Sequence, residues 1–203
     1  IRNDLEAPPK INLNTIMQFI SRPSWCLNMM TAKKLNFGNI MGHVTNVTNL
    51  SSLASWTADQ FDPTLTWEDI AWIKDRWKGK LILKGIMDSE DAMLAVKAGA
   101  DAIIISNHGG RQLDGAPSTI SVLPEIVDAV NSKVEVHFDG GVRSGQDVLK
   151  ALALGADCIH IGRPYVYGLG AKGQEGVEIA IEIIKKELDL TCLLYTSPSP
   201  RDQ

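Results

Sequence analysis

The sequence lacks a hydrophobic run long enough to cross a membrane. No window of its 203 residues offers about 18 consecutive apolar residues, which a spanning helix needs. It also lacks a block of basic residues, and 24 acidic against 20 basic residues give a net charge of −4, which argues against nucleic-acid binding. Since 44% of the residues are hydrophobic, a disordered chain is excluded and an ordinary globular domain is expected.

Cysteine is scarce in this sequence. Cys26, Cys158 and Cys192 lie far apart, and none belongs to a C-x-x-C pair. This distribution excludes a zinc framework and a disulfide scaffold, so we predict no metal site and a reducing compartment, the cytoplasm. The N-terminus has no apolar segment of the kind found in signal peptides and no initiator methionine, so we expect the sequence to belong to a longer chain.

Four short apolar runs alternate with helix-like stretches in the second half of the sequence. The runs cover residues 81–86, 102–106, 134–138 and 158–162, and the helix-like stretches cover 88–99, 122–130, 144–155 and 173–188. Strands that are apolar along their whole length, each followed by a helix, are typical of the parallel sheet of an α/β fold. Four such units match half of a (β/α)8 TIM barrel.

The flanking residues follow other patterns. Apolar periodicity predicts a helix over 11–21, and Thr66 and Asp69 have the spacing of a capping box that begins a helix over 66–77. Residues 21–65 are rich in Asn, Ser and Thr and are predicted to form a long variable loop. Residues 192–203 have no periodicity, contain two Ser-Pro steps and resemble a translated sequencing adapter, so we expect the domain to cover 1–191.

The segment SNHGGRQLDG (106–115) directly follows the second predicted strand. In parallel α/β folds, residues just beyond the strands' carboxyl ends line the functional site. His108 is able to accept a proton near neutral pH, and Arg111 is able to bind a carboxylate through two parallel hydrogen bonds. The segment therefore predicts acid–base chemistry on a carboxylate, and the alternative is a polar loop without a catalytic role.

Two further segments at strand ends combine glycine with arginine. FDGGVRSG (138–145) opens a helix, and IGRP (161–164) follows the fourth strand. Backbone N–H groups, a helix N-terminus and guanidinium groups together favour phosphate, although solvated glycine turns remain the alternative. Lys84 lies within an apolar strand and needs either a ligand or a partner carboxylate. His43, His137 and His160 are interpreted as structural residues.

Together, Lys84 and the three segments resemble the FMN-dependent 2-hydroxy-acid oxidase and dehydrogenase family, and the order, spacing and identity of the motifs agree over 81–164. The stretches NFGNIMGH and SSLASWTADQFDPTLTW are most similar to the L-lactate dehydrogenase branch that uses a cytochrome or quinone. The resemblance implies the C-terminal half of the barrel, with FMN as cofactor. It also implies the following roles: His108 as the base, Arg111 as the carboxylate ligand, Lys84 at the flavin N1/O2 edge, Ser106 as a flavin contact, and Asp139, Gly140, Gly141, Arg143, Gly162 and Arg163 as the ribityl and phosphate site.

The implied reaction oxidises a short L-2-hydroxy acid, with L-lactate favoured, to the 2-oxo acid. The alternatives are an oxygen-using glycolate or lactate oxidase and a non-catalytic half-barrel that binds phosphate or flavin. In the family an Asp on the fourth strand pairs with the catalytic His; no segment before Lys80 matches that strand, so the isolated chain is expected to be inactive. The resemblance also implies a homo-oligomer and, through residues 21–65, peripheral contact with the inner membrane, to which Trp25, Met29, Met30, Lys33 and Lys34 are suited.

Overall fold

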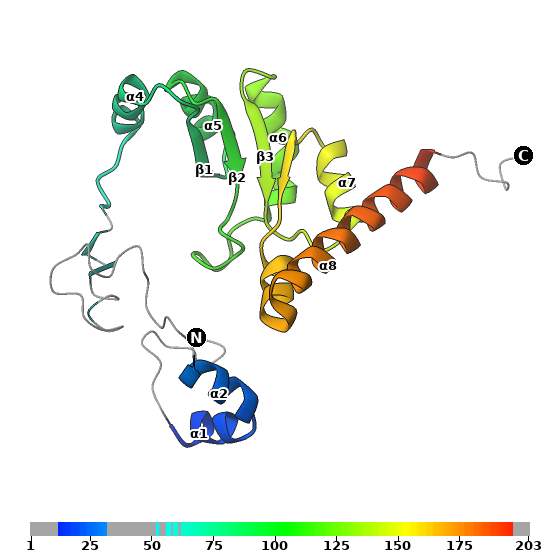
Figure 1. Ribbon diagram of the computed structural model, residues 1–203. Coiled ribbons are helices and arrows are strands. Elements are labelled where there is room, and N and C mark those ends of the chain that lie inside the picture. Colours follow the sequence, from blue (N-terminus) through cyan, green and yellow to red (C-terminus); the bar gives the residue numbers. More distant parts are fainter. Residues whose placement is uncertain (1–11, 32–51, 53–55, 58, 61, 197–203) are drawn as a thin grey trace, which may run out of the picture. The chain divides into compact units, whose positions relative to one another are not determined.

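The computed structural model describes residues 12–31, 52, 56–57, 59–60 and 62–196 (Figure 1). The chain divides into two compact units, residues 1–65 and 66–203. None of the described helices is long and apolar enough to cross a membrane.

In the first unit, two short helices are described. Helix α1 (Leu13–Ile20) lies within the predicted range 11–21, and the Asn12 side chain caps it by accepting a hydrogen bond from the Thr15 N–H (2.9 Å). Helix α2 (Pro23–Thr31) falls in the stretch predicted as a loop, so that prediction was wrong for these residues. Pro23 favours a helix because its fixed φ suits the first helical position. Phe19 stacks on Trp25 with ring centroids 5.6 Å apart, which joins the two helices.

The second unit holds a sheet of four parallel strands. The strands are β1 (Ile82–Ile86), β2 (Ala102–Ile105), β3 (Glu135–Asp139) and β4 (Cys158–His160), and they lie in the order β1-β2-β3-β4. Helix α4 (Trp67–Arg76) precedes the sheet and begins with the predicted Thr66–Asp69 capping box. The helices that follow the strands are α5 (Ser89–Lys97), α6 (Thr119–Val130), α7 (Gly145–Ala153) and α8 (Arg163–Thr196). The predicted α/β fold with parallel neighbouring strands, as in one half of a TIM barrel, is confirmed.

Helix α8 differs from its predicted range at both ends. It begins at Arg163, ten residues before the predicted start at 173, and a kink at Lys172 and Gly173 separates its two parts. Gly173 has φ +60°, which a glycine adopts without strain, so the predicted start is the position of the kink. At the other end the helix continues to Thr196. The prediction that residues 192–203 lack regular structure was therefore wrong for 192–196, and the two Ser-Pro steps lie outside the described residues.

The two faces of the sheet have different surroundings. Side chains from one face pack beneath the helices and form the core, where Ile103 and Ile105 of β2 and Val136 and Phe138 of β3 are buried. The opposite face carries Lys84, Ile104, His137 and Cys158, which stand side by side on the four strands. Side chains alternate along a strand, so every second residue of each apolar run packs into the core beneath the helices. The residues between them point to the opposite face of the sheet.

A Gly-Ala-Asp sequence occurs twice, each time between a helix and the strand that follows it. Gly99 (φ +84°) ends the turn after α5, and Gly155 (φ +101°) ends the turn after α7. In both copies the aspartate accepts a hydrogen bond from the preceding strand: Asp101 from the Leu81 N–H (2.9 Å) and Asp157 from the Val136 N–H (2.8 Å). Each aspartate therefore ties the start of its own strand to its neighbour.

Asp101 makes additional ion pairs that generate a stability prediction. Its carboxylate lies 2.5 Å from Lys74 Nζ and 3.0 Å from Lys80 Nζ. Hydrogen bonds from Lys74, the Leu81 N–H and Lys80 hold the pKa of Asp101 well below its ordinary value. A carboxyl group whose pKa is lower in the folded state stabilises the fold above its unfolded pKa of about 3.9, and the stabilisation is lost as the pH falls further.

We expect Asp101→Asn to lower the free energy of unfolding at pH 7, because it removes the charged partner of two lysines. The difference in the free energy of unfolding between the variant and the wild-type chain should shrink as the pH is lowered from about 5 to about 3. In this range the Asp101 carboxylate of the wild-type chain begins to lose its stabilising contribution. Urea denaturation followed by circular dichroism at several pH values measures this, with Asp128→Asn, on the exposed side of α6, as the control. A deficit that is independent of pH would contradict the electrostatic explanation.

Candidate active site

The predicted site residues surround one cavity at the carboxyl ends of the strands. The cavity has a volume of about 360 Å³. Of the residues named from the sequence, those that line it are Lys84, His108, Arg111, Asp139, Gly140, Gly141, Arg143, Gly162 and Arg163. Ser106 does not line the cavity but hydrogen-bonds to three residues that do, Lys84, His108 and Asp139. Segments up to 79 residues apart in the sequence thus meet, because parallel strands bring their carboxyl ends to the same edge of the sheet.

The charges around the cavity favour an anionic ligand. Four cationic side chains line it, namely Lys84, Arg111, Arg143 and Arg163, against the single carboxylate of Asp139. The whole chain carries a net charge of −4, so the positive charge around the cavity is opposite in sign to the net charge of the protein. A concave surface of one charge sign raises the local concentration of ligands of the opposite sign. The cavity is therefore suited to groups such as phosphate and carboxylate.

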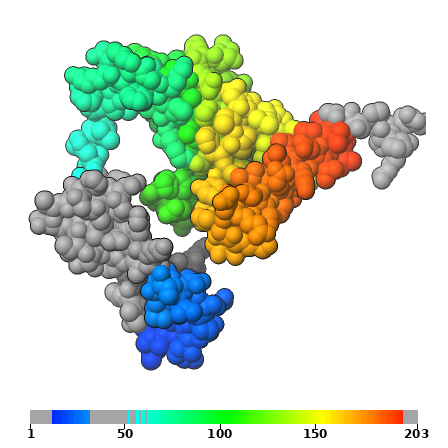
Figure 2. Space-filling view, viewed as in Figure 1, coloured from blue at the N-terminus to red at the C-terminus, as the bar shows by residue number. Residues whose placement is uncertain are grey.

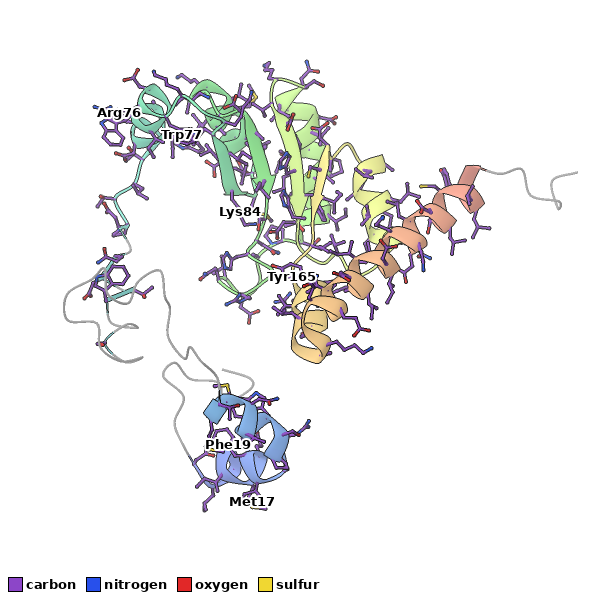
Figure 3. All side chains as sticks on the ribbon, in the orientation of Figure 1. Met17, Phe19, Arg76, Trp77, Lys84 and Tyr165 are labelled. Atoms are coloured by element: carbon purple, nitrogen blue, oxygen red, sulfur yellow. The ribbon has the colours of Figure 1, made fainter. Side chains whose placement is uncertain are left out.

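Lys84, Ser106 and Asp139 form a hydrogen-bonded group at the edge of this cavity. Lys84 is labelled in Figure 3. Lys84 Nζ donates to Ser106 Oγ (2.9 Å) and forms an ion pair with Asp139, and Ser106 Oγ donates to Asp139 Oδ1 (3.0 Å). The sequence left open whether Lys84 meets a ligand or a carboxylate. Asp139 is that carboxylate, and Lys84 still lines the cavity. Ser106, which follows β2, and Asp139, at the end of β3, fix the ammonium group in place.

The loop that carries His108 has an unusual backbone. His108 has φ +58°, followed by Gly109 at +69° and Gly110 at +70°. A non-glycine residue in the left-handed region is uncommon and is typically found at functional sites. Ser106 Oγ accepts the His108 N–H (3.2 Å), and Asn107 Oδ1 accepts the Gly110 N–H (3.1 Å). These contacts hold the tight turn that presents the exposed His108 and Arg111 side chains.

The two arginine–glycine segments are held by different contacts. The Asp147 carboxylate accepts the N–H groups of Arg143 (2.9 Å) and Ser144 (3.0 Å) in a capping box at the start of α7. Burial raises the pKa of Asp147, but these hydrogen bonds outweigh it and leave the pKa below its ordinary value. Arg163 Nη2 donates to the Gly109 carbonyl (2.9 Å), which links the loop after β4 to the His108 loop. Asp147 was missed from the sequence, although Ser144-x-x-Asp147 has the spacing of a capping box.

Comparison with known proteins agrees with this arrangement. The profile of the FMN-dependent dehydrogenase family matches residues 1–202. The chain belongs to this family. The chain is similar to L-lactate dehydrogenase from Vibrio cholerae serotype O1 (strain M66-2), which is 42% identical over 192 residues, covering 94% of this chain and 51% of the relative. L-lactate dehydrogenase from Xanthomonas oryzae pv. oryzae (strain PXO99A) is 43% identical over 187 residues, covering 92% and 48%.

Solved structures of FMN-dependent dehydrogenase relatives are similar too. The crystal structure of the monotopic membrane protein (S)-mandelate dehydrogenase superposes with a TM-score of 0.86 at 34% identity, covering 95% of this chain and 50% of that one. Mandelate oxidase with benzoyl-formic acid gives a TM-score of 0.61 at 50% identity, covering 64% and 38%. The chain thus spans about half the length of the relatives that it matches. The resemblance seen in the sequence motifs is confirmed at the level of the family.

The residues of this family member fit the cofactor in the family's name. FMN has a phosphate, which the Gly140–Arg143 and Gly162–Arg163 segments suit, because glycine leaves the backbone accessible and arginine supplies paired donors. Gly141 has φ +80° and no atom within 4 Å of the position that a side chain would occupy, so its surroundings are open to a ligand. FMN also has an electron-rich ring edge, which the Lys84 ammonium group suits.

Two histidines that were interpreted as structural lie next to each other near the cavity. His137 Nδ1 and His160 Nε2 lie 3.1 Å apart on β3 and β4, and His160 also lines the cavity. Burial, together with the charges of His137 and Lys84, lowers the pKa of His160, although Asp139 opposes the shift. The signal was present in the sequence, because each histidine lies two residues before a strand-end motif residue, Asp139 or Gly162, and therefore on the same face.

Proposed function

We propose that this chain forms part of an enzyme that uses FMN to oxidise a short L-2-hydroxy acid to the 2-oxo acid. The observation that carries the proposal is the common cavity of His108, Arg111, Lys84 and the two arginine–glycine segments. It combines a proton acceptor, a carboxylate ligand, and a cationic cradle for phosphate.

Arg111 and His108 are assigned to the substrate. The Arg111 guanidinium group pairs with the substrate carboxylate, which every 2-hydroxy acid carries, and so fixes the position of the neighbouring C2 carbon. His108 lies three residues earlier in the same turn and accepts the proton of the 2-hydroxyl group through its imidazole ring. FMN, when bound, would supply the acceptor for the C2 hydrogen and the two electrons that leave with it.

Lys84 and its neighbours are assigned to the cofactor. The Lys84 ammonium group stabilises negative charge at the flavin N1/O2 edge, and Ser106 and Asp139 hold it in position. The ribityl and phosphate groups are assigned to Asp139, Gly140, Gly141, Arg143, Gly162 and Arg163. Asp147 is a positioning residue, because it holds the backbone of Arg143 and Ser144.

L-Lactate is the favoured substrate, with a quinone or cytochrome as acceptor, because the relatives with 42–43% identity are named L-lactate dehydrogenase. The alternative is an oxygen-using oxidase for a larger hydroxy acid, which the 50% identity to mandelate oxidase favours. His108 and Arg111 serve the part common to all these substrates and do not distinguish among them.

The phosphate assignment is testable by comparing FMN with riboflavin, which lacks the phosphate. We expect Arg143→Gln combined with Arg163→Gln to weaken FMN binding by about 100-fold or more, since each variant removes a hydrogen bond to a charged group that contributes roughly 1.5–3 kcal/mol. Riboflavin binding should stay unchanged. Quenching of flavin fluorescence measures both affinities, with Lys185→Gln on α8 as the charge-removal control. An equal loss for both flavins would assign the arginines to the ring system instead.

The catalytic assignment is testable in a chimera that joins this chain to the N-terminal half of the Vibrio cholerae relative. We expect the flavin-loaded chimera to reduce a dye with L-lactate, and His108→Gln to lower kcat by about 10²- to 10⁴-fold. A panel of lactate, glycolate and mandelate, with dye or oxygen as acceptor, identifies the branch. Faster turnover of mandelate with oxygen would favour the oxidase, and bound FMN without turnover would favour a non-catalytic flavin-binding protein.

We further propose that helices α1 and α2 contact a membrane surface. Large apolar side chains stand exposed on both, with Ile20 68% and Met30 76% exposed. The solved (S)-mandelate dehydrogenase is described as a monotopic membrane protein, which supports the proposal. Of the residues singled out from the sequence, Trp25, Met29 and Met30 lie on α2, whereas Lys33 and Lys34 lie outside the described residues.

Sedimentation with anionic liposomes tests this contact. We expect Ile20→Ser combined with Met30→Ser to reduce the bound fraction of the chain several-fold, because burying each side chain contributes roughly 1.5–3 kcal/mol. Leu190→Ser, an exposed apolar residue of α8, is the matched control and should leave binding unchanged. Equal losses for both variants would indicate non-specific adsorption.

A further inference from the structure

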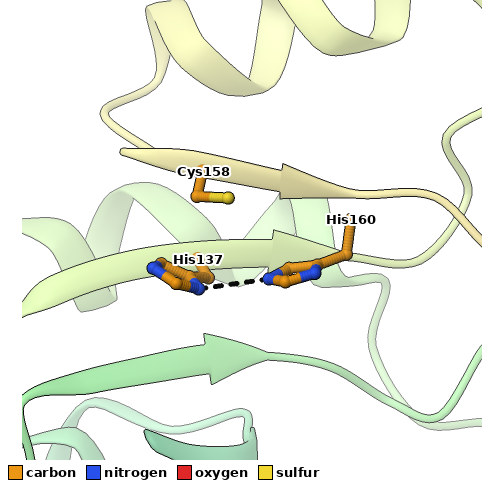
Figure 4. Close-up of side chains that lie close together, drawn as sticks. All are labelled: His137, Cys158 and His160. Atoms are coloured by element: carbon orange, nitrogen blue, oxygen red, sulfur yellow. Dashed lines mark hydrogen bonds between the residues drawn. The ribbon is translucent and has the colours of Figure 1, made fainter. Parts of the chain in front are cut away.

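A cluster of three metal-binding side chains lies on the open face of the sheet, outside the set of residues assigned to FMN and substrate. His137 comes from β3, and Cys158 and His160 come from β4 (Figure 4). Each offers one ligand atom, and the three atoms all lie within 4.8 Å of one another. His137 is buried, and the other two are partly buried. Imidazole and thiolate groups prefer zinc and similar transition metals to magnesium or calcium.

The spacing of the two imidazole rings suits a tetrahedral ion. His137 Nδ1 and His160 Nε2 face each other at 3.1 Å. Two nitrogens bound to one zinc ion at about 2.0–2.1 Å stand roughly 3.3 Å apart in tetrahedral geometry, so the observed pair needs to separate by only a few tenths of an ångström. Without a metal, one proton has to lie between these two nitrogens to make a hydrogen bond.

Glu135 decides which ring carries that proton. His137 Nε2 lies 3.3 Å from Glu135 Oε2, and a carboxylate only accepts hydrogen bonds. The neutral His137 ring therefore keeps its proton on Nε2 and leaves a free lone pair on Nδ1. The shared proton then belongs to His160 Nε2. A carboxylate that holds the distal N–H of a ligating histidine is the usual outer partner in zinc sites.

We propose that His137, Cys158 and His160 bind a zinc-type divalent ion, with Glu135 orienting His137. The ion takes the place of the proton between His137 Nδ1 and His160 Nε2, and that proton moves to His160 Nδ1, so the ring binds as neutral imidazole. The ion also displaces the thiol proton of Cys158, so one proton is released for each ion bound. The prediction from the sequence was that no metal binds, because the cysteines form no C-x-x-C pair. The ligands instead come from adjacent strands, where the register places His137 beside Cys158. The site does not depend on the proposed oxidation reaction.

The test uses the 203-residue chain after removal of metals with a chelator, and Co²⁺ as the spectroscopic probe. We expect one equivalent of Co²⁺ to produce thiolate-to-cobalt charge-transfer absorption, and Zn²⁺ to displace it. Cys158→Ser should abolish this absorption. Cys26→Ser, which removes a thiol from the other unit, should retain it. Circular dichroism of each variant verifies that the chain is folded.

Glu135→Gln gives a second and gentler test, because the Glu135 side chain is 71% exposed and its replacement leaves the core intact. We expect the dissociation constant for Zn²⁺ to rise about 10- to 100-fold, as is typical when the outer partner of a metal-binding histidine is changed. The proposal is wrong if the folded wild-type chain binds no equivalent of Co²⁺, or if the charge-transfer absorption survives in Cys158→Ser. Binding of Zn²⁺ to Glu135→Gln as tight as to the wild-type chain would also overturn it.

Discussion

The alternation of side chains along four parallel strands in register is the constraint on which the rest of the molecule depends. On β2, Ile103 and Ile105 point to the helix side and are fully buried, while Ile104 points the other way. The same alternation on β3 buries Val136 and Phe138 and sends His137 and Asp139 to the opposite face. One face therefore supplies the free energy of folding, and the other is left to carry polar groups.

Much of the second unit was predictable because its signals are local. Each apolar run is bounded by a glycine or a capping residue, and the boundaries hold within one or two residues for strands 82–86 and 135–139. The site was predictable for a related reason. Residues that directly follow strands in a parallel sheet have to meet at one edge, so His108, Arg143 and Arg163 were expected to line a common cavity.

The histidine pair and helix α2 were not predicted from the sequence, because they depend on contacts between strands or on single residues. His137 and His160 are 23 residues apart, and their pairing follows from the register of β3 and β4. Helix α2 forms in a segment without a helical apolar period, where Pro23 and the stacking of Phe19 on Trp25 favour the helix. Composition averages over many residues, so it misses a helix that one proline and one aromatic pair favour.

Asp139 is a carboxylate in a cavity that is otherwise suited to anions, and the cationic side chains around it explain its presence. Lys84, Arg111, Arg143 and Arg163 repel one another, and Lys84 is the one that arises from within a strand, where it has the least freedom to move away. Asp139 offsets this repulsion by pairing with Lys84, and its second oxygen is engaged by Ser106. With both oxygens occupied, Asp139 is turned toward Lys84 of β1 and toward Ser106, which follows β2. Because Asp139 pairs with Lys84, the guanidinium groups of the three arginines have no carboxylate partner among the residues that line the cavity and are available to bind an anionic ligand. One carboxylate thus reduces the repulsion at the sheet edge, and the cavity retains a net positive charge.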